Sequence, residues 1–185
     1  MNSKNLTIRF ATAEDWNSIE TLFGKKGASN GCWCLYWLIG PEYKRRDREL
    51  NKIAFEKEVS HDMTGIIAYR DDVPVGWARF SRRSTLEYLM ERFSSYNFSA
   101  DDPMTLSCFY ISSKARNTGV MTELINYACN WAKKNEEAIE AYPIDIEKRK
   151  VVTDAFTGAL STFLKAGFVE LAPMAKNRPV VRFEK

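Results

Sequence analysis

Hydrophobic and polar residues follow two repeating patterns along this chain, one typical of strands and one typical of helices. Leu6, Ile8 and Phe10 alternate with polar residues, which predicts a first strand. Residues 104–111 are almost continuously apolar, as expected for a strand buried on both faces. Residues 120–135 instead repeat apolar side chains every three or four positions, which predicts a long amphipathic helix.

Turn and capping residues divide the rest of the chain. Asp71 and Asp72 separate two β-prone runs, which predicts a hairpin over 65–80. Thr12 is the expected N-cap of a helix that ends near Phe23. Further helices are predicted over 42–61, 84–93 and 154–164, and further strands over 138–144, 168–172 and 180–183. In the helix over 42–61 the side chains expected to face inward are Leu50, Ile53, Ala54 and Val59.

The predicted order of elements is β α α β β α β α β α β β. Hairpins in the first half and alternating strands and helices in the second predict an α/β fold, with a mixed sheet and helices on its faces. Gly167 is expected to end the last helix as a left-handed cap. Because 185 residues fit one hydrophobic core, we expect a single domain over residues 1–185.

Composition narrows the class of protein. Hydrophobic residues make up 45% of the chain and charged residues 28%, which is ordinary for a globular protein. No apolar run approaches the ~20 residues that span a bilayer, and the N-terminus lacks a signal-peptide pattern. We therefore expect a cytoplasmic protein that does not contact membranes. The net charge of +3 argues against a nucleic-acid partner.

The densest basic cluster is Lys44-Arg45-Arg46-Asp47-Arg48. We interpret it as the solvated face of a helix, and attraction of phosphates or an acidic substrate is the alternative. The four cysteines are Cys32, Cys34, Cys108 and Cys129, and His61 is the single histidine. One C-x-C pair with two scattered cysteines does not match the ligand spacing of a structural zinc site, so we expect free thiols and no metal.

The segment with the clearest chemistry runs from Cys108 to Thr122. A buried strand leads into a loop of small residues, and the loop leads into the amphipathic helix. Backbone N–H groups at the start of such a helix lack internal partners and, with the helix dipole, bind anions such as a pyrophosphate. Gly119 would let the backbone approach a ligand closely. An ordinary strand-to-helix turn with a glycine is the alternative.

These residues carry a resemblance to a known family. Arg116-Asn117-Thr118-Gly119-Val120-Met121 resembles the R/Q-x-x-G-x-G/A loop of the GNAT (Gcn5-related N-acetyltransferase) superfamily, with Met121 in place of the usual small residue. The hairpin over 72–78 and the helix over 159–168 that ends in Gly-Phe are also similar to that family. The segment 31–37, Gly-Cys-Trp-Cys-Leu-Tyr-Trp, further resembles a branch of bacterial GNAT-like proteins.

The resemblance implies a mixed, mostly antiparallel sheet of six to seven strands with a splayed parallel pair and helices on both faces. It implies acetyl-CoA as co-substrate, with the pantetheine arm between strands over 107–111 and 140–143. The cofactor-binding residues it implies are Phe109, Tyr110, Ile111, Arg116, Asn117, Thr118, Gly119, Val120, Met121 and Phe163. A backbone N–H in the middle of the first of these strands would stabilise the developing oxyanion.

Many relatives carry a tyrosine as general acid on the late helix, at the position where this chain has Phe163. The substitutes by predicted position are Cys108, Tyr110 and Tyr142, although the sequence favours a core side chain for each. For the acceptor we expect contacts from Trp33, Tyr36, Trp37 and Glu87. The aromatic residues among these form either a wall for the acceptor or a hydrophobic plug.

The leading interpretation is an acetyl-CoA-dependent N-acetyltransferase that acts on a primary amine of a small molecule or peptide, by direct attack in a ternary complex. A non-catalytic module that binds or senses acyl-CoA is the alternative, and the absence of the usual acid at Phe163 motivates it. An exposed final strand and an aromatic content of 13% are compatible with a homodimer.

Overall fold

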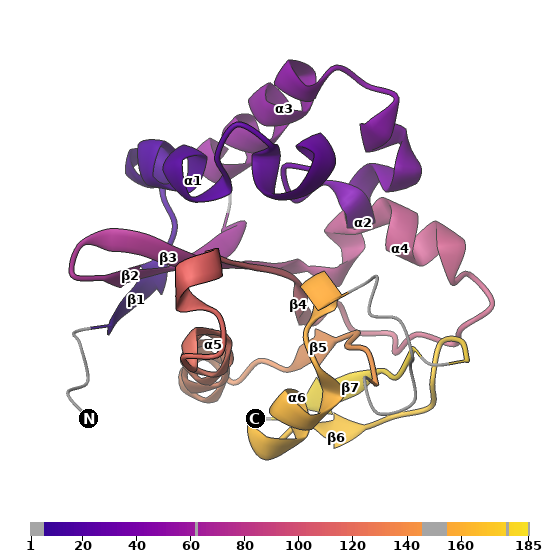
Figure 1. The fold of residues 1–185 in the computed structure, drawn as a ribbon. Coiled ribbons are helices and arrows are strands. Elements are labelled where there is room, and N and C mark those ends of the chain that lie inside the picture. The colour runs from indigo at the N-terminus through magenta and orange to yellow at the C-terminus, as the bar shows by residue number, and fades with distance from the viewer. Residues whose placement is uncertain (1–5, 62, 146–154, 177, 185) are drawn as a thin grey trace.

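The computed structural model describes residues 6–61, 63–145, 155–176 and 178–184. Its centre is a seven-stranded sheet in the order β1-β2-β3-β4-β5-β7-β6. Neighbouring strands are antiparallel except for β4 and β5, which are parallel. Helices cover both faces of the sheet, with α1 to α4 on one face and α5 and α6 on the other (Figure 1). The predicted fold class is confirmed.

The elements have the following bounds. The strands are β1 (Leu6–Phe10), β2 (Gly65–Arg70), β3 (Val73–Arg82), β4 (Met104–Ile111), β5 (Ile139–Ala141), β6 (Val169–Glu170) and β7 (Val181–Phe183). The α-helices are α1 (Trp16–Phe23), α2 (Tyr36–Ile39), α3 (Arg48–His61), α4 (Glu87–Arg92), α5 (Val120–Asn135) and α6 (Leu160–Lys165). Short 3-10 turns cover Ala13–Asp15, Gly40–Lys44, Arg83–Thr85, Ser113–Ala115 and Ala155–Thr157, and a π-type turn covers Gly27–Gly31.

The predicted hairpin joins β2 to β3. Asp71 and Asp72 have φ angles of +50° and +62°. Positive φ at both central residues is the backbone twist that suits a two-residue hairpin, and aspartate tolerates it better than most residues do. Thr12 is the N-cap of the 3-10 turn that leads into α1, and its backbone N–H donates to the Asp15 carboxylate at 3.0 Å.

The face of the sheet below β4 is covered by α5. Its buried side chains repeat at helical spacing, and they are Val120, Leu124, Ile125, Ala128, Cys129 and Ala132. They pack with Phe80, Leu106 and Phe109 from the sheet. The predicted helix over 120–135 is confirmed, and its apolar stripe fixes how the preceding loop meets the strand.

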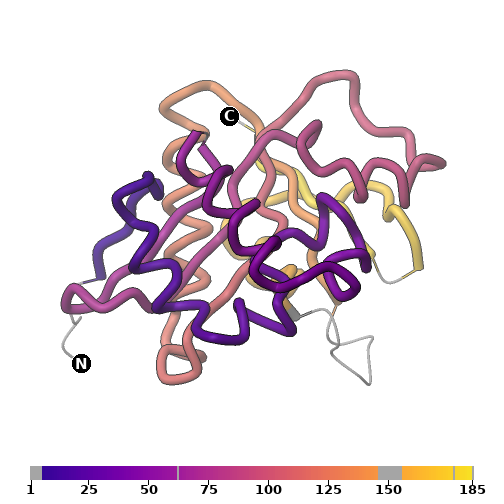
Figure 2. The backbone as a smooth tube through the Cα atoms, turned by 90° about the horizontal axis from the view of Figure 1, so that it is seen from above, coloured from indigo at the N-terminus to yellow at the C-terminus, as the bar shows by residue number. Residues whose placement is uncertain are grey.

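The opposite face is covered by an aromatic layer. The ring of Phe23 stacks on Phe55 at 5.6 Å, and Trp77 meets Phe55 edge-on at 5.4 Å. Seen from above, the chain from α1 to α3 crosses over the strands (Figure 2). Asn51 ties this layer together, because its side-chain amide donates to the carbonyl oxygens of Gly31 at 2.9 Å and Tyr43 at 2.8 Å.

The predicted helix over 42–61 was wrong in its start and in part of its buried face. Residues 40–44 form a 3-10 turn, and α3 begins only at Arg48. Leu50 and Ile53 are 49% and 53% exposed, whereas Phe55 is fully buried. Val59 is buried as predicted, and with Asn51 and Phe55 it forms a face of four-residue spacing that packs on the layer around Phe23.

The predicted elements near the C-terminus were too long. The helix expected over 154–164 is interrupted at Gly158, whose φ of +82° ends a 3-10 turn before α6 begins at Leu160. Position 154, its expected start, lies outside the described residues. The strand expected over 138–144 joins the sheet as Ile139–Ala141, and Ile144 forms an isolated bridge with Ala159. Gly167 has φ +95°, so the predicted left-handed cap is confirmed.

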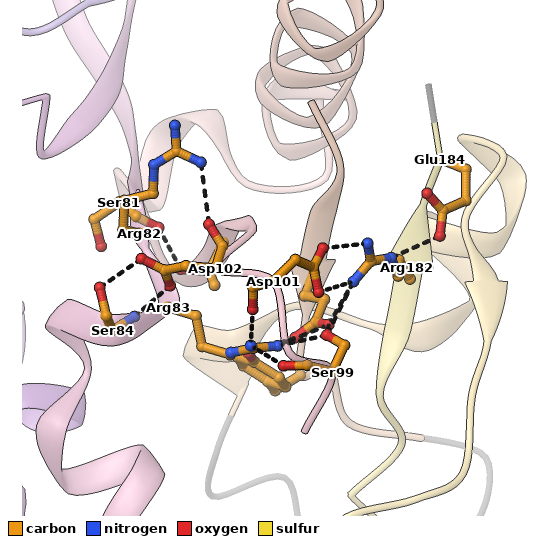
Figure 3. A network of polar contacts seen from close by, with 12 residues as sticks. Ser81, Arg82, Arg83, Ser84, Ser99, Asp101, Asp102, Arg182 and Glu184 are labelled. Carbon is orange, nitrogen blue, oxygen red and sulfur yellow. Dashed lines mark hydrogen bonds and ion pairs between the residues drawn. The ribbon is translucent and has the colours of Figure 1, made fainter. Parts of the chain in front are cut away.

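A buried polar network holds β5 in place (Figure 3). The Glu140 carboxylate accepts from Arg83 at 3.1 Å and from Arg182 at 3.1 Å. Arg83 also donates to the carbonyl oxygen of Ser99, and Arg182 is bound by Asp101 at 2.6 Å. Since Arg83 and Glu140 are almost fully buried, this network fixes β5 and β7 against the chain segment before β4.

Candidate functional site

The site begins where the two parallel strands separate. β5 pairs with β4 only from Met104 to Leu106, while β4 continues along β3 as far as Ile111. Ser107 is an extra residue in β4, because Arg79 pairs with Cys108 and the next residue of β3 pairs with Leu106. Such a bulge bends its strand and increases the local twist. The outer edge of β4 beyond Leu106 is therefore turned away from β5.

The loop after β4 leads directly into α5. The backbone N–H of Ser112 donates to the carbonyl oxygen of Val75 at 2.9 Å, and this bond anchors the loop to β3. Asn117 and Gly119 then take φ angles of +60° and +84°. A Cβ built on Gly119 would meet no atom within 4 Å, so the backbone angle itself is what favours glycine here. The first turn of α5 presents its unpaired N–H groups at this point.

Basic side chains surround this loop. Arg70, at the end of β2, donates to the Thr118 hydroxyl at 3.1 Å, and Thr118 donates to the carbonyl oxygen of Ala115 at 2.7 Å. Arg116 donates to the carbonyl oxygen of Ile111 at 3.3 Å. Positive charge, a helix N-terminus and free amides together suit a phosphate or pyrophosphate group.

A cleft of about 620 Å³ extends from this loop along the edge of β4. Its lining residues are Ala28, Ser29, Phe109, Tyr110, Ile111, Ala115, Arg116, Asn117, Gly119, Val120, Met121, Thr122 and Phe156. We call it the loop cleft. It contains most of the residues that the sequence assigned to the cofactor. Thr118 belongs to the loop, and its hydroxyl donates to the carbonyl oxygen of Ala115. Phe163 is buried beneath the loop cleft, with its ring centroid 6.0 Å from that of Phe109.

A second cavity of about 340 Å³ opens on the other side of β4. Its lining residues are Phe23, Ala28, Ser29, Asn30, Cys32, Cys34, Tyr36, Tyr43, Lys44, Cys108, Phe109, Tyr110 and Phe156. We call it the aromatic cavity. It shares Ala28, Ser29, Phe109, Tyr110 and Phe156 with the loop cleft, so the two spaces meet along β4.

The segment before α2 is shaped by unusual backbone angles. Ala28, Asn30, Trp33 and Cys34 all have positive φ. A Cβ on Gly27 would lie 2.4 Å from the Trp33 indole, so only glycine lets Trp33 pack there. The sequence analysis missed the contribution of residues 28–30 and of Phe156 to the site. The two glycines that bracket 27–31 were the available signal for a compact turn.

The expected acceptor residues separate into three groups. Tyr36 lines the aromatic cavity. Trp33 and Trp37 are 5% and 1% exposed and lie in the core, where the Trp37 indole donates to the Ser107 carbonyl oxygen at 3.0 Å. Glu87 begins α4 and lines a different hollow, together with Arg79 and Thr85. Tyr36 is thus the one of the four that the structure brings to the aromatic cavity.

The three expected catalytic residues also differ in position. Cys108 and Tyr110 both line the aromatic cavity, and Tyr110 lines the loop cleft as well. Tyr142 is fully buried, and its hydroxyl donates to Glu140 at 3.0 Å. Burial and the neighbouring carboxylate raise the pKa of Tyr142 well above its ordinary value. Its position ties it to the network around β5 rather than to either cavity.

Comparison with known proteins identifies a family whose match includes β4, the loop and α5. Residues 30–168 match the model of a family described as the acetyltransferase (GNAT) family. The chain belongs to the GNAT acetyltransferase family. It is therefore an acyltransferase of the GNAT type, as the resemblance of the loop and hairpin implied. No match is found among curated proteins.

Solved GNAT structures share the fold at low sequence identity. A histone acetyltransferase HPA2 and related acetyltransferase from Corynebacterium glutamicum superposes with a TM-score of 0.58 at 20% identity, over 96% of this chain and 94% of that one. The PaiA N-acetyltransferase of Thermoplasma acidophilum, solved in complex with coenzyme A, gives 0.57 at 11% identity, over 98% and 99%. YncA of Salmonella typhimurium, solved with acetyl-CoA, gives 0.53 at 13%, over 97% and 93%.

None of the described helices of this GNAT protein is long and apolar enough to cross a membrane. Within the described residues, no group of three or more histidine, cysteine or acidic side chains is arranged to hold a metal ion.

Proposed function

We propose that the protein is an acetyl-CoA-dependent N-acetyltransferase that acetylates a primary amine of a small molecule or peptide by direct attack in a ternary complex. The observation that carries the proposal is the junction of the two cavities along β4, at Phe109, Tyr110 and Phe156. Donor and acceptor could then reach one another from opposite sides of the strand. Holding two reactants in this way converts a bimolecular step into an effectively unimolecular one.

The loop cleft fits coenzyme A. Its open φ-positive glycine, Gly119, leaves room for a pyrophosphate beside the amides of residues 116–122, and Arg70 and Arg116 supply positive charge. Phe109 and Ile111 would pair their backbone groups with the pantetheine amides along the edge of β4 that β5 leaves open. When bound, acetyl-CoA supplies the activated acyl group as a thioester.

Tyr110 is our choice of general acid. It lines both cavities, on the strand along which the thiolate would leave. A backbone N–H of β4 near Cys108 would stabilise the oxyanion that forms on the acyl carbonyl. The alternative acid, Cys108, faces the aromatic cavity from the same strand.

The aromatic cavity would hold the acceptor. Lys44 is the one charged side chain among the described residues that line it. The described residues that line the cavity include no carboxylate that could accept a proton from an ammonium group. We therefore infer that the acceptor amine binds in its neutral form or loses its proton to water. The aromatic rings of Tyr36 and Tyr43 suit an acceptor with an apolar or planar body.

Release of coenzyme A tests this proposal. We would titrate acetyl-CoA by calorimetry and then follow coenzyme A by chromatography with a panel of amines. Tyr110→Phe should lower kcat by about 10²-fold with little change in acetyl-CoA affinity. Tyr127→Phe is the matched control, because Tyr127 packs on Phe10 beneath the sheet. Binding without release for any amine would instead favour a module that senses acyl-CoA.

A further inference from the structure

Two cysteines from distant parts of the chain meet in the wall of the aromatic cavity. Cys34 belongs to the strained segment before α2, and Cys108 lies in β4 directly after the bulge. Arg79 pairs with Cys108 across the sheet, and its guanidinium donates to the Cys34 carbonyl oxygen at 3.3 Å. The two thiols hydrogen bond to each other. Both side chains line the cavity.

The surroundings make the two thiols unequal. Burial alone would raise the pKa of Cys34, but the hydrogen bond from Cys108 and the positive charge of Arg79 outweigh it and lower that pKa. The same hydrogen bond, together with burial, raises the pKa of Cys108 well above its ordinary value. Cys34 is thus the better nucleophile, and Cys108 keeps its proton.

Other groups near Cys34 modify this picture without reversing it. The Glu58 carboxylate accepts from Arg79 at 2.5 Å, and its negative charge acts to raise the pKa of Cys34. Cys32 also lines the cavity, but burial raises its pKa to about 11, so it stays a thiol. Arg79 is itself fully enclosed between Glu58 and the two cysteines. A neighbouring guanidinium lowers the pKa of a cysteine and so favours its reactive thiolate form.

We propose that Cys34 and Cys108 are a redox-modification site, oxidised by hydrogen peroxide to a disulfide that closes the aromatic cavity to the acceptor. Formation of the disulfide does not depend on the function proposed above. Its effect on turnover does, because it rests on the aromatic cavity being the acceptor site.

The chemistry balances with peroxide as the oxidant. The Cys34 thiolate attacks one oxygen of hydrogen peroxide, the O–O bond breaks, and hydroxide leaves as the sulfenic acid forms. The Cys108 thiol then attacks the Cys34 sulfur, the S–O bond breaks, and a second hydroxide leaves. The protons of the two thiols neutralise both hydroxides. Two thiols and one peroxide therefore give one disulfide and two waters.

The disulfide would change one cavity and spare the other. It ties the segment before α2 to β4 and draws two wall residues of the aromatic cavity together. Neither cysteine is among the lining residues of the loop cleft. Oxidation should therefore lower acceptor-dependent turnover by about tenfold or more, through misplacement of the acceptor, while acetyl-CoA affinity stays within about twofold.

The test uses the full chain, treated with hydrogen peroxide and then with dithiothreitol. Peptide mapping by mass spectrometry should find Cys34 joined to Cys108, with loss of two hydrogens and full reversal by the reductant. In Cys108→Ser, dimedone should label Cys34 as a sulfenic acid; in Cys34→Ser, Cys108 should stay unlabelled. Cys129→Ser is the matched control, because Cys129 is buried on α5 and burial raises its pKa to about 11.

A disulfide through Cys32, or dimedone labelling of Cys108 rather than Cys34, would overturn the proposal. So would peroxide treatment that leaves both thiols intact in folded protein. The mapping is informative even if no amine is acetylated, so failure of the thiol pair and failure of the proposed acetyltransferase activity are separate results.

Discussion

The indole nitrogen of Trp37 donates a hydrogen bond of 3.0 Å to the carbonyl oxygen of Ser107, the extra residue at which β4 turns away from β5. Trp37 is 1% exposed, so this bond satisfies a carbonyl that the parallel strand no longer reaches. A side chain from α2 thus completes the sheet where the loop cleft and the aromatic cavity begin.

Trp37→Phe should therefore destabilise the protein by about 1–3 kcal/mol, because it leaves the Ser107 carbonyl buried without a donor. Urea unfolding would measure the loss. Trp131→Phe is the control, since Trp131 packs edge-on against Phe80 at 5.2 Å beneath the sheet and is half-buried. Equal losses in the two variants would show that the Trp37 hydrogen bond contributes nothing beyond packing.

Gly119→Ala should weaken acetyl-CoA binding by about tenfold or more, because it adds a side chain to the loop cleft and disfavours the φ of +84°. Gly24→Ala is the matched control. Gly24 also has positive φ and open space around it, but it caps α1 away from the cleft. Gly119→Ala should lose about 1–2 kcal/mol of stability, and Gly24→Ala about 1–3 kcal/mol, because its ψ of −175° lies in a region that only glycine adopts readily. Calorimetry should show an affinity change in Gly119→Ala alone.

Glu140→Gln should cost about 3–5 kcal/mol, because it removes the carboxylate that compensates the buried cation of Arg83 and also binds the partly buried Arg182. Glu184 also binds Arg182, at 2.6 Å, but its side chain is 66% exposed. Glu184→Gln should therefore change stability by no more than about 0.5 kcal/mol. A Glu140→Gln protein as stable as wild type in thermal unfolding would contradict this account of the network.

Asp15 should give the fold a specific sensitivity to acid. Burial alone would raise its pKa, but hydrogen bonds from Tyr69 and Thr12 and the charge of Arg9 outweigh burial and lower that pKa. A carboxyl with a lowered folded-state pKa contributes stability above its unfolded pKa and loses it as pH falls through the folded value.

Asp15→Asn should therefore flatten the dependence of unfolding free energy on pH between about 5 and 2. Denaturation at a series of pH values would measure the slope. The neighbouring exposed residue supplies the control, Glu14→Gln, which should keep the wild-type slope. The assignment to Asp15 fails if both variants follow the wild-type curve.

The parts of the site that could be predicted from the sequence are those with local signals. The apolar run of β4, the positive-φ glycine at Gly119 and the helical repeat of α5 lie next to one another in the chain. Each signal reflects backbone geometry that neighbouring residues determine. The part of the loop cleft formed by β4, the loop and α5 could therefore be predicted, whereas Ala28, Ser29 and Phe156 were missed and Phe163 is buried beneath the cleft.

The acceptor side depends on distant partners, so the sequence left it open. Whether Trp37 faces solvent or the core is decided by a carbonyl at Ser107, and Tyr142 is drawn to Glu140 by the arginines around it. The buried face of α3 was predicted only in part, because Asn51 and Phe55 find their partners in Tyr43 and Phe23, outside the helix. Periodicity within one segment carries no information about such partners.

The extra residue Ser107 has a consequence for every side chain that follows it in β4. Met104 and Leu106 point toward α5, and so do Phe109 and Ile111. Strict alternation would instead have sent positions 108 and 110 toward α5. The single inserted residue exchanges odd and even positions for the second half of the strand. A regular strand of the same residues, without the bulge, would hide Cys108 and Tyr110 in the core and turn Phe109 and Ile111 toward the acceptor, with no change in their identities.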